Sequence, residues 1–456
     1  MQVSAKDFFT QFWCLNQKVI VNKICIKLFS TTSDRVRNIF TRGTELASIP
    51  RSSCSSIPFK ENAMPSFRRS LIATAALLGL AVLTVSAQAE ETIKIGLVTA
   101  LSGQSAKAGE ALTRGMAVAI DEINAKGGLL GGRKLVLVRR DDEGNPAKGA
   151  VAARELIFKE QVAVLFGGLD TPVSMAIVPI ANQEKIPFMG PWAAGTPITK
   201  NGASPNFAFR VSAVDEIVDK AMLQYAVKTF KSAKPGMILV NNSWGESNEK
   251  GLSAALLAKN IKSVGIEKFD ANDVDVVPQL GKLRAAGADV LFMVGNVGPS
   301  AQVVKSLDRM GWKVPVVSHW GPAGGRFTEL AGANAKSVHF VQTYSFFGKQ
   351  GPVGDKVMKA LMAKYPDIKG AEDVTPAVGV ANAYDAVQLV ALAIARAGST
   401  KGDEVRQGFY KIDRYEGLIK TYVKPFTVDV HDAVTENDYV WAQFIDNRIL
   451  PVGMTN

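Results

Sequence analysis

Short apolar runs alternate with amphipathic segments along most of this chain, and this alternation restricts its fold more than any other feature. The run Thr92–Leu101 is rich in Ile and Val and is typical of a buried strand. In the next segment Leu112, Met116 and Ile120 fall four residues apart, as on one face of a helix. Strands that alternate with helices build parallel sheets, because each helix returns the chain to the start of the next strand. The sequence therefore predicts an α/β fold.

The alternation occurs in two series. The first has expected strands at 92–101, 134–142, 162–168 and 186–189, and the second at 236–242, 264–269, 288–295, 314–320 and 337–344. The segment 206–219 separates the two series. We therefore predict two doubly wound, Rossmann-like lobes.

The start of the chain carries the features of an export signal. Arg68 and Arg69 precede a 15-residue apolar run, 71–85, and residues 87–89 (Ala-Gln-Ala) suit a cleavage site. A transmembrane helix needs about 20 apolar residues. We therefore interpret 64–89 as a cleaved signal peptide and expect a periplasmic protein; an uncleaved anchor is the alternative.

Residues 1–63 lie upstream of this signal, where an exported protein has no need of a segment. We interpret them as a non-native extension from a misassigned start, with an organellar transit segment as the alternative. All three cysteines, Cys14, Cys25 and Cys54, lie there. From Met64 onward the sequence therefore has no disulfide framework, thiolate nucleophile, thiolate metal site or lipoprotein cysteine.

The positive charge of the chain is concentrated in the same leader. The whole sequence has a formal net charge of +11, and residues 1–89 carry 11 Lys and Arg against 4 Asp and Glu. No run of Lys or Arg in the remaining body reaches the density of a nucleic-acid patch. We therefore expect no nucleic-acid partner.

Ligands of open parallel sheets bind beyond the carboxyl ends of the strands, so the loops after the expected strands are the candidate site. These loops are 100–109, 167–171, 190–197, 241–247, 295–300 and 318–325. Thr171 suits a helix N-cap and Pro172 the first helical position, where free N–H groups favour an anion; a plain capped helix is the alternative. Trp192 stands among small, uncharged residues. Ser102 either contacts a ligand or only makes a turn.

The sequence lacks the motifs of the common enzyme classes. It has no G-x-G-x-x-G, G-x-x-x-x-G-K-[ST], G-x-S-x-G or H-E-x-x-H. His339 is expected in the core and His431 in a polar turn. His319 follows a strand, and the sequence leaves open whether it faces the cleft between the lobes. Asp141 and Asp142 are interpreted as a solvated turn rather than an acid pair. We expect a non-enzymatic chain with no catalytic residue, metal or cofactor, which binds a small molecule between its lobes.

Three blocks of the body carry a specific pattern: 93–146, 162–168 and 383–394. The first holds a strand, a Ser-Gly loop, a helix that ends in Asn-Ala-Lys-Gly-Gly, and a second strand followed by Asp-Asp. In this pattern the body resembles the type I periplasmic binding proteins, and more narrowly the leucine/isoleucine/valine-binding component of branched-chain amino acid ABC importers. The resemblance implies a non-enzymatic receptor that closes on its ligand and docks on a membrane permease. It also implies three crossovers, which divide the chain into lobe 1 (90–210 and 341–427) and lobe 2 (211–340 and 428–456).

The resemblance also implies where the ligand binds. In the family, hydroxyls and backbone N–H groups of two loops hold the ligand carboxylate, and these loops match 168–171 and 192–196. An aromatic side chain of the other lobe covers the ligand, and Trp244 matches that position. The expected binding residues are Ser102, Gly168, Leu169, Asp170, Thr171, Trp192, Ala193, Ala194, Thr196, Trp244, Asn296, His319 and Trp320.

Two positions depart from the family. Ala108 stands where the family has a tyrosine, and residues 319–321 (His-Trp-Gly) stand where an acid pairs with the ligand's ammonium group. An unpaired ammonium group is costly to bury. We therefore expect a small carboxylate that lacks an α-amino group and stacks on tryptophan, unless another acid such as Glu246 restores amino acid binding.

Two other classes of protein stay open from the sequence. A ligand sensor of the same fold would act on a regulator instead of a permease, but export favours the importer receptor. A secreted α/β enzyme would need a catalytic set that the sequence lacks. We expect a monomer whose partners are a small carboxylate and an ABC permease.

Overall fold

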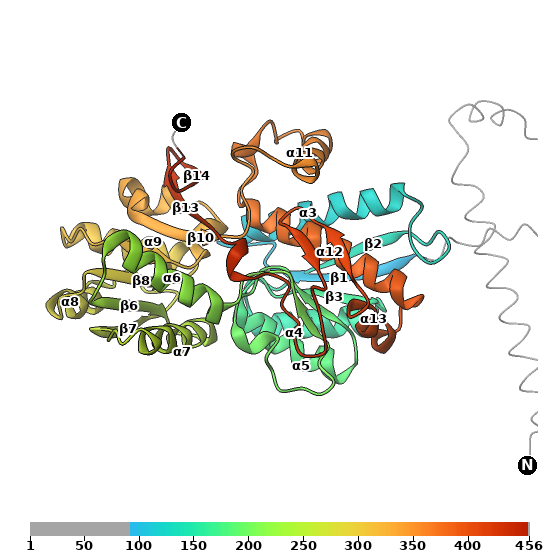
Figure 1. The fold of residues 1–456 in the computed structure, drawn as a ribbon, viewed down its shortest axis with the longest axis horizontal. Coiled ribbons are helices and arrows are strands. Elements are labelled where there is room, and N and C mark those ends of the chain that lie inside the picture. Colours follow the sequence, from blue (N-terminus) through green and yellow to red (C-terminus); the bar gives the residue numbers. More distant parts are fainter. Residues whose placement is uncertain (1–91, 455–456) are drawn as a thin grey trace, which may run out of the picture. The chain divides into compact units, whose positions relative to one another are not determined.

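Lobe 1 is built around a sheet of five parallel strands (Figure 1, blue to green). The computed structural model describes residues 92–454, so the expected signal peptide and the upstream extension lie outside the described residues. The strands are, in sheet order, β2 (Leu135–Asp141), β1 (Ile93–Thr99), β3 (Val164–Gly167), β4 (Phe188–Gly190) and β5 (Ala208–Arg210). The connecting helices are α3 (Ala106–Ala125), α4 (Pro146–Phe158) and α5 (Thr171–Gln183).

Lobe 2 is built around a seven-stranded sheet. Its strands are, in sheet order, β14 (Arg448–Pro451), β13 (Val440–Ile445), β10 (Val338–Gln342), β9 (Val316–Ser318), β8 (Val290–Val294), β6 (Pro235–Val240) and β7 (Gly265–Phe269). Its helices are α6 (Asp215–Phe230), α7 (Ser243–Ala258), α8 (Val277–Ala285), α9 (Val297–Arg309) and α10 (Phe327–Ala331). All the strands expected from the sequence are present, and the prediction of two doubly wound lobes is confirmed. The antiparallel strands β13 and β14, and the short β5, were not predicted.

Burial explains why the strands could be recognised in the sequence. All six residues of β6 and all five of β8 are buried, because helices cover both faces of the sheet. Such strands are continuous apolar runs rather than alternating ones. The helix ends are set locally: the side chains of Asn145 and Asn242 accept the first free N–H groups of α4 and α7. After α3, Gly128 has φ +77°, and a Cβ there would lie 2.4 Å from the carbonyl oxygen of Arg133, so only glycine fits.

The chain returns to lobe 1 after β10. The returning elements are α11 (Pro352–Lys364), α12 (Ala377–Ala397), α13 (Gly402–Phe409), β11 (Arg414–Glu416) and β12 (Thr421–Val423). Helix α12 packs against α3, where a Cβ on Gly115 would lie only 2.3 Å from the carbonyl oxygen of Val380 (Figure 1). Within residues 92–454, α12 is the one helix long and apolar enough to cross a membrane, and most of it is buried inside the protein.

The chain crosses between the lobes at three places: after β5, after β10 and before β13. The first and third crossings are joined by a buried ion pair, in which Nε of Arg210 lies 2.7 Å from Oδ1 of Asp432. The second is anchored by Thr343, whose hydroxyl donates to Oδ1 of Asn382 at 2.7 Å. The residue boundaries assigned to the lobes from the sequence stay a prediction. Short 3₁₀ helices lie at Thr196–Ile198, Gly321–Gly324, Gly332–Ser337, Ala371–Asp373 and Glu436–Asp438.

Candidate ligand-binding site

The loops that follow the strands of the two sheets contact one another. Nδ2 of Asn296, at the start of α9, donates to Oδ1 of Asp170 in lobe 1 at 2.7 Å. The N–H of Thr196 in lobe 1 donates to Oγ of Ser247 in lobe 2 at 3.1 Å. The carboxyl ends of both sheets therefore meet, and this is the place where open parallel sheets bind ligands. We call these contacting loops the interlobe site.

Two loops of lobe 1 are tied together in this site. The N–H of Gly195 donates to Oγ1 of Thr171 at 3.1 Å. Gly168 has φ +56°, and a Cβ there would lie 2.1 Å from Oγ of Ser174, so this position requires glycine. The expected helix cap is wrong by one residue: Asp170 is the N-cap of α5 and Thr171 begins the helix. The hydroxyl of Thr171 bonds to Gly195 of the neighbouring loop instead of capping its own helix.

Several hydrogen-bond donors in these two loops have no protein acceptor. The buried backbone N–H groups of Leu169, Ala193 and Ala194 donate to no group within residues 92–454. The hydroxyls of Thr171 and Thr196 each accept a backbone hydrogen bond and donate none in that part of the chain. Buried donors normally have a partner, and the N-terminus of α5 adds the positive end of a helix dipole. The lobe 1 side of the site is therefore suited to an anion.

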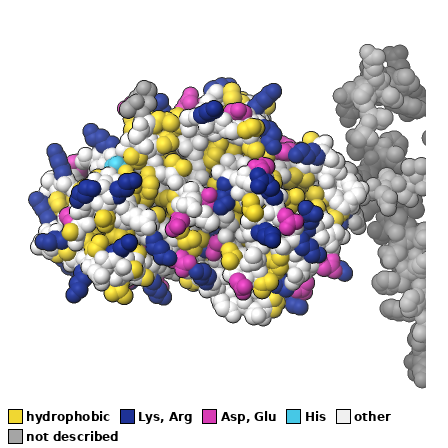
Figure 2. Space-filling view, in the orientation of Figure 1, with side chains coloured by type: hydrophobic (Ala, Val, Ile, Leu, Met, Phe, Trp, Pro, Cys, Tyr) yellow, Lys and Arg dark blue, Asp and Glu magenta, His cyan; other side chains and the backbone are white. Residues whose placement is uncertain are grey.

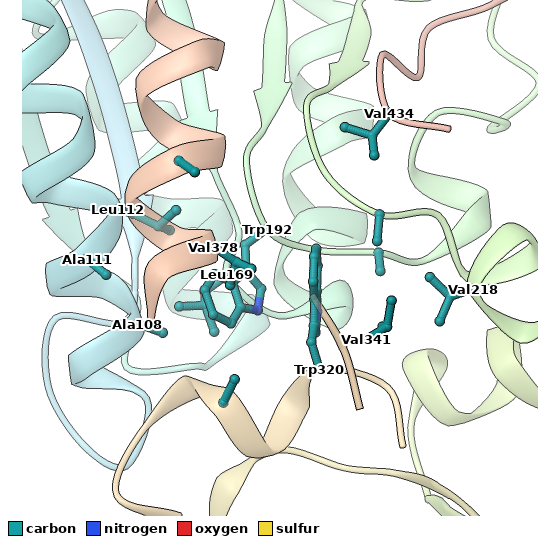
Figure 3. Close-up of a cluster of buried hydrophobic side chains, with 14 of the residues drawn as sticks. Ala108, Ala111, Leu112, Leu169, Trp192, Val218, Trp320, Val341, Val378 and Val434 are labelled. Carbon is teal, nitrogen blue, oxygen red and sulfur yellow. The ribbon is translucent and has the colours of Figure 1, made fainter. Parts of the chain in front are cut away.

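Trp192 and Trp320 form the apolar part of the site. Their ring centroids lie 5.5 Å apart, with 40° between the ring planes, and both rings are buried. A Cβ on Gly379 of α12 or on Gly324 of lobe 2 would lie 3.3 or 3.7 Å from the Trp192 ring. Figure 3 shows Trp192 close to Ala108 of α3, with Trp320 beside it. Trp192 therefore contacts both lobes, and small residues around it make room for the indole.

Asp215, the first residue of α6, is fully buried in the site. Its N–H donates to the carbonyl of Ala194 at 2.9 Å, and its Oδ1 accepts from Nε1 of Trp244 at 3.1 Å. Nε2 of His319 lies 3.1 Å from the same oxygen without forming a hydrogen bond, and Oδ2 has no partner within residues 92–454. Asp215 was not among the residues predicted from the sequence. It lies in the segment 206–219 that separates the two series of strands, and its only signal was an acidic residue at the start of a helix.

His319 and Trp320 follow β9 and reach the site together. Nδ1 of His319 accepts the N–H of Trp320 at 2.8 Å, so the neutral ring carries its proton on Nε2, on the side of Asp215. The His319 ring lies between two indoles, with centroid distances of 5.2 Å to Trp244 and 5.4 Å to Trp320. The sequence left open whether His319 faces the cleft between the lobes. In the structure its side chain faces the interlobe site.

Two further acids, the buried Asp142 and the partly buried Asp170, lie where the lobe 1 strands end. Burial raises the pKa of Asp170, although its hydrogen bond to lobe 2 acts in the other direction. Burial also raises the pKa of Asp142 to about 7; the N–H of Gly144 opposes this shift, and the charges of Asp170 and Asp141 add to it. The expectation of a solvated acidic turn is wrong for Asp142, because its side chain folds beneath the turn. Asp141 stays exposed.

Most of the expected binding residues lie in the interlobe site. These are Gly168, Leu169, Asp170, Thr171, Trp192, Ala193, Ala194, Thr196, Trp244, Asn296, His319 and Trp320. Ser102 is instead exposed on the loop before α3, where it contacts Asp141. Glu246 is exposed on the first turn of α7. Gln104 reaches lobe 2 although the sequence did not single it out: a Cβ on Gly298 would lie 1.9 Å from its Oε1.

Comparison with known proteins identifies the family of this two-lobed fold. The sequence pattern of the periplasmic binding proteins matches residues 92–444. The chain belongs to the periplasmic binding protein family. The resemblance drawn from the sequence is therefore confirmed, and so is the expectation of a non-enzymatic chain, because this is a family of solute-binding receptors.

Individual relatives of this periplasmic binding protein agree with that assignment. A Leu/Ile/Val-binding protein homolog of Brucella melitensis is 26% identical over 331 residues, which are 73% of this chain and 85% of that protein. A branched-chain amino acid transporter substrate binding protein of Streptococcus pneumoniae, solved in complex with isoleucine, has a TM-score of 0.66 at 23% identity and covers 79% of this chain and 98% of its own. An ABC transporter solute binding protein of R. palustris, solved in complex with benzoate, has a TM-score of 0.67 at 22% identity over 79% and 96%. The solved structures confirm the type I fold.

Proposed function

We propose that this periplasmic binding protein is the exported receptor of an ABC importer, which binds a small carboxylate in the interlobe site and presents it to a membrane permease. The observation that carries the proposal is that hydrogen-bond donors without an acceptor on lobe 1 meet a buried acid on lobe 2, Asp215, of which one carboxylate oxygen has no partner within residues 92–454. Closure would occur by bending at the three crossings. Export through the segment 64–89, a periplasmic location and a monomeric state are parts of the same proposal.

Lobe 1 supplies the groups that bind the carboxylate. The free N–H groups of Leu169, Ala193 and Ala194 and the hydroxyls of Thr171 and Thr196 give hydrogen-bond donors without a full positive charge. Hydrogen bonds to a charged group contribute about 1.5–3 kcal/mol each. No cationic side chain is needed for such a site, because the helix N-terminus of α5 already favours negative charge.

Lobe 2 supplies an acid for a positive group on the same ligand. The sequence offered no acid after β9, which was the reason to expect a ligand without an α-amino group. Asp215 reaches the same neighbourhood from α6, beside His319 and Trp244. These contacts favour a ligand with an ammonium group, and we propose an amino acid as the first ligand class.

An amino-less aromatic carboxylate is the second ligand class, and the two tryptophans favour it. Trp192 and Trp320 present flat apolar surface from opposite lobes, and flat rings stack well on such surfaces. One relative of this fold was solved with isoleucine and another with benzoate. The two classes differ in the ammonium group, so matched pairs of ligands separate them.

Calorimetric titration with matched pairs tests the proposal. Leucine is compared with 4-methylpentanoate, and phenylalanine with 3-phenylpropanoate; each pair differs only in the α-amino group. If Asp215 pairs with the ligand, the amino acid of a pair should bind at least about tenfold more tightly. Tighter binding of the amino-less acid would select the second ligand class. Absence of heat with any amino acid or carboxylate would contradict the receptor proposal.

A further inference from the structure

A lysine stands shortly before four of the parallel strands of lobe 2. These lysines are Lys234 before β6, Lys262 before β7, Lys313 before β9 and Lys336 before β10. All four are exposed. Parallel strands begin at the same edge of a sheet, so the four lysines share one edge. That edge is opposite to the interlobe site, which lies at the carboxyl ends of the strands.

The helices that return to this edge add four more cations. Lys228 and Lys231 lie at the end of α6, Lys259 follows α7, and Arg284 lies in the last turn of α8. Figure 2 shows Lys and Arg side chains gathered at this left-hand end of the molecule, with few acidic ones between them. We call the following eight residues the basic edge: Lys228, Lys231, Lys234, Lys259, Lys262, Arg284, Lys313 and Lys336.

Two acids near the basic edge, Asp289 and Asp308, form no ion pair with its cations. Asp289 is engaged by the hydroxyl of Ser232 at 2.5 Å and by the N–H groups of the next two residues. Asp308 accepts from Nδ2 of Asn334 at 2.6 Å. The four strand-preceding lysines form no ion pair with any residue between 92 and 454. Their charge is therefore available to an outside partner.

An apolar hollow lies within the basic edge. It has a volume of about 520 Å³. Its lining includes the apolar Phe230, Trp312 and Val314 and the charged Lys313, Lys336 and Asp308. Trp312 is partly exposed. A partly exposed indole among lysines is the combination found where proteins meet the interface of a membrane.

We propose that the basic edge docks on an anionic phospholipid bilayer. The four lysines that precede strands stand on separate loops and are flexible point charges, which suits a fluid plane of negative headgroups better than a partner of fixed shape. The hollow around Trp312 accommodates the apolar side of that interface. After export, such a contact keeps the receptor near the membrane that carries its permease and leaves the interlobe site, on the opposite side of lobe 2, free to take up ligand.

Co-sedimentation with vesicles tests this proposal. Phosphatidylcholine vesicles with and without phosphatidylglycerol are mixed with the purified protein at low and at physiological salt. The test variant carries four changes: Lys234→Gln, Lys262→Gln, Lys313→Gln and Lys336→Gln. The matched control removes the same charge from four exposed lysines elsewhere: Lys349→Gln, Lys359→Gln, Lys369→Gln and Lys411→Gln. The wild type, the test variant and the control share the apolar run 71–85, so any vesicle binding by that run is the same in all three proteins.

The wild type and the control should bind in proportion to phosphatidylglycerol and less at higher salt, and the test variant should partition at least about tenfold less. Titration of an interlobe ligand into the test variant should be unchanged, which separates this proposal from that of the receptor site. Equal binding of test variant and control, or binding to phosphatidylcholine alone, would overturn the proposal. Loss of binding to the purified permease, with vesicle binding intact, would assign the edge to an acidic protein instead.

Discussion

Nε1 of Trp244 donates a hydrogen bond to Oδ1 of Asp215 at 3.1 Å, and this bond joins α7 to α6 in the interlobe site. The indole fixes the orientation of the carboxylate and occupies only one of its oxygens. Oδ2 of Asp215 has no partner within residues 92–454. A buried acid in this state is costly unless something compensates its charge, and this is the reason to propose Asp215 as a ligand-binding residue.

Asp215→Asn should weaken binding of amino acids by about 10- to 100-fold, because a hydrogen bond to a charged group contributes about 1.5–3 kcal/mol. Binding of the matched amino-less carboxylate should change far less. Glu246→Gln is the control, since Glu246 is exposed on the neighbouring helix. Calorimetric titration measures all four affinities. An equal loss for both members of a ligand pair would show that Asp215 acts on the fold and not on the ammonium group.

Trp320→Ala should lower the affinity for any interlobe ligand by at least about tenfold, because this ring packs on Trp192 of the other lobe and central interface aromatics dominate binding energies. Trp441→Ala is the matched control: that ring stacks on Tyr225 within lobe 2, with centroids 3.9 Å apart. Intrinsic fluorescence and titration check the prediction. Retention of full affinity in Trp320→Ala would contradict the assignment of this ring to the site.

Asp142 should make the stability of the protein depend on pH. Its pKa is raised from 3.8 to about 7, so the folded state holds a proton that the unfolded state has already lost. The free energy of unfolding should therefore fall as pH rises from about 4 to about 7 and stay low above that. Asp142→Asn should remove this fall and stabilise the protein at pH 8, by up to about 4 kcal/mol. Urea unfolding at several pH values measures the difference.

The neighbouring Asp141 gives the control of opposite sign. Burial acts to raise the pKa of Asp141, but hydrogen bonds from Ser102, Leu101 and Glu143 outweigh it and lower the pKa. Its contribution to stability should therefore be present at neutral pH and disappear as pH falls below its unfolded value. Asp141→Asn should cost stability at pH 7 and little near pH 3. The same pH slope in both variants would show that the two side chains share one environment.

Arg210→Met should lower the free energy of unfolding by about 3–5 kcal/mol, because it leaves a largely buried Asp432 without its partner. The guanidinium also donates to the carbonyls of Ala193 and Gly195, so the loss should loosen one wall of the interlobe site. Asp432→Asn in the same background should recover part of the loss. Urea unfolding of the single and double variants checks this; additive losses would contradict a coupled pair.

The fold followed from the sequence because the central strands of its sheets are buried on both faces. Runs such as that of β6 and β8 are apolar throughout, and the intervening helices show their own spacing. The antiparallel β13 and β14 were missed because partly buried strands carry mixed residues: in β13, Trp441 and Gln443 stand among apolar ones. A continuous apolar run therefore identifies a deeply buried strand more reliably than mixed residues identify a partly buried one.

The positions of the candidate site residues could be predicted only where they depend on chain order. Thr171 and Trp192 could be placed because each follows a strand, and the loops after parallel strands gather at one edge. Asp215 could not be placed, because its contact with Trp244 depends on how α6 packs against α7. Asp142 was misjudged for the same reason: an acidic turn with glycine resembles solvent-exposed chain, yet the side chain folds inward.

The basic edge could not be predicted from the sequence, for a different reason. Lys234, Lys262, Lys313 and Lys336 are separated by long segments, so no run of charge exists. They come together because each precedes a strand of the same parallel sheet. The charge density along a sequence therefore underestimates the positive charge that lies at the amino ends of the strands of a parallel sheet.

The most direct test of the receptor proposal is a crystal structure of the protein purified from its native host. It should show electron density for a small carboxylate in the interlobe site, with its oxygens near the hydroxyls of Thr171 and Thr196. Its apolar part should lie against Trp192 or Trp320. An amino group, if present, should lie within 3.5 Å or so of Asp215, a distance at which charged hydrogen bonds form. Density for a bound solute elsewhere in the protein, with none between these loops, would contradict the proposal.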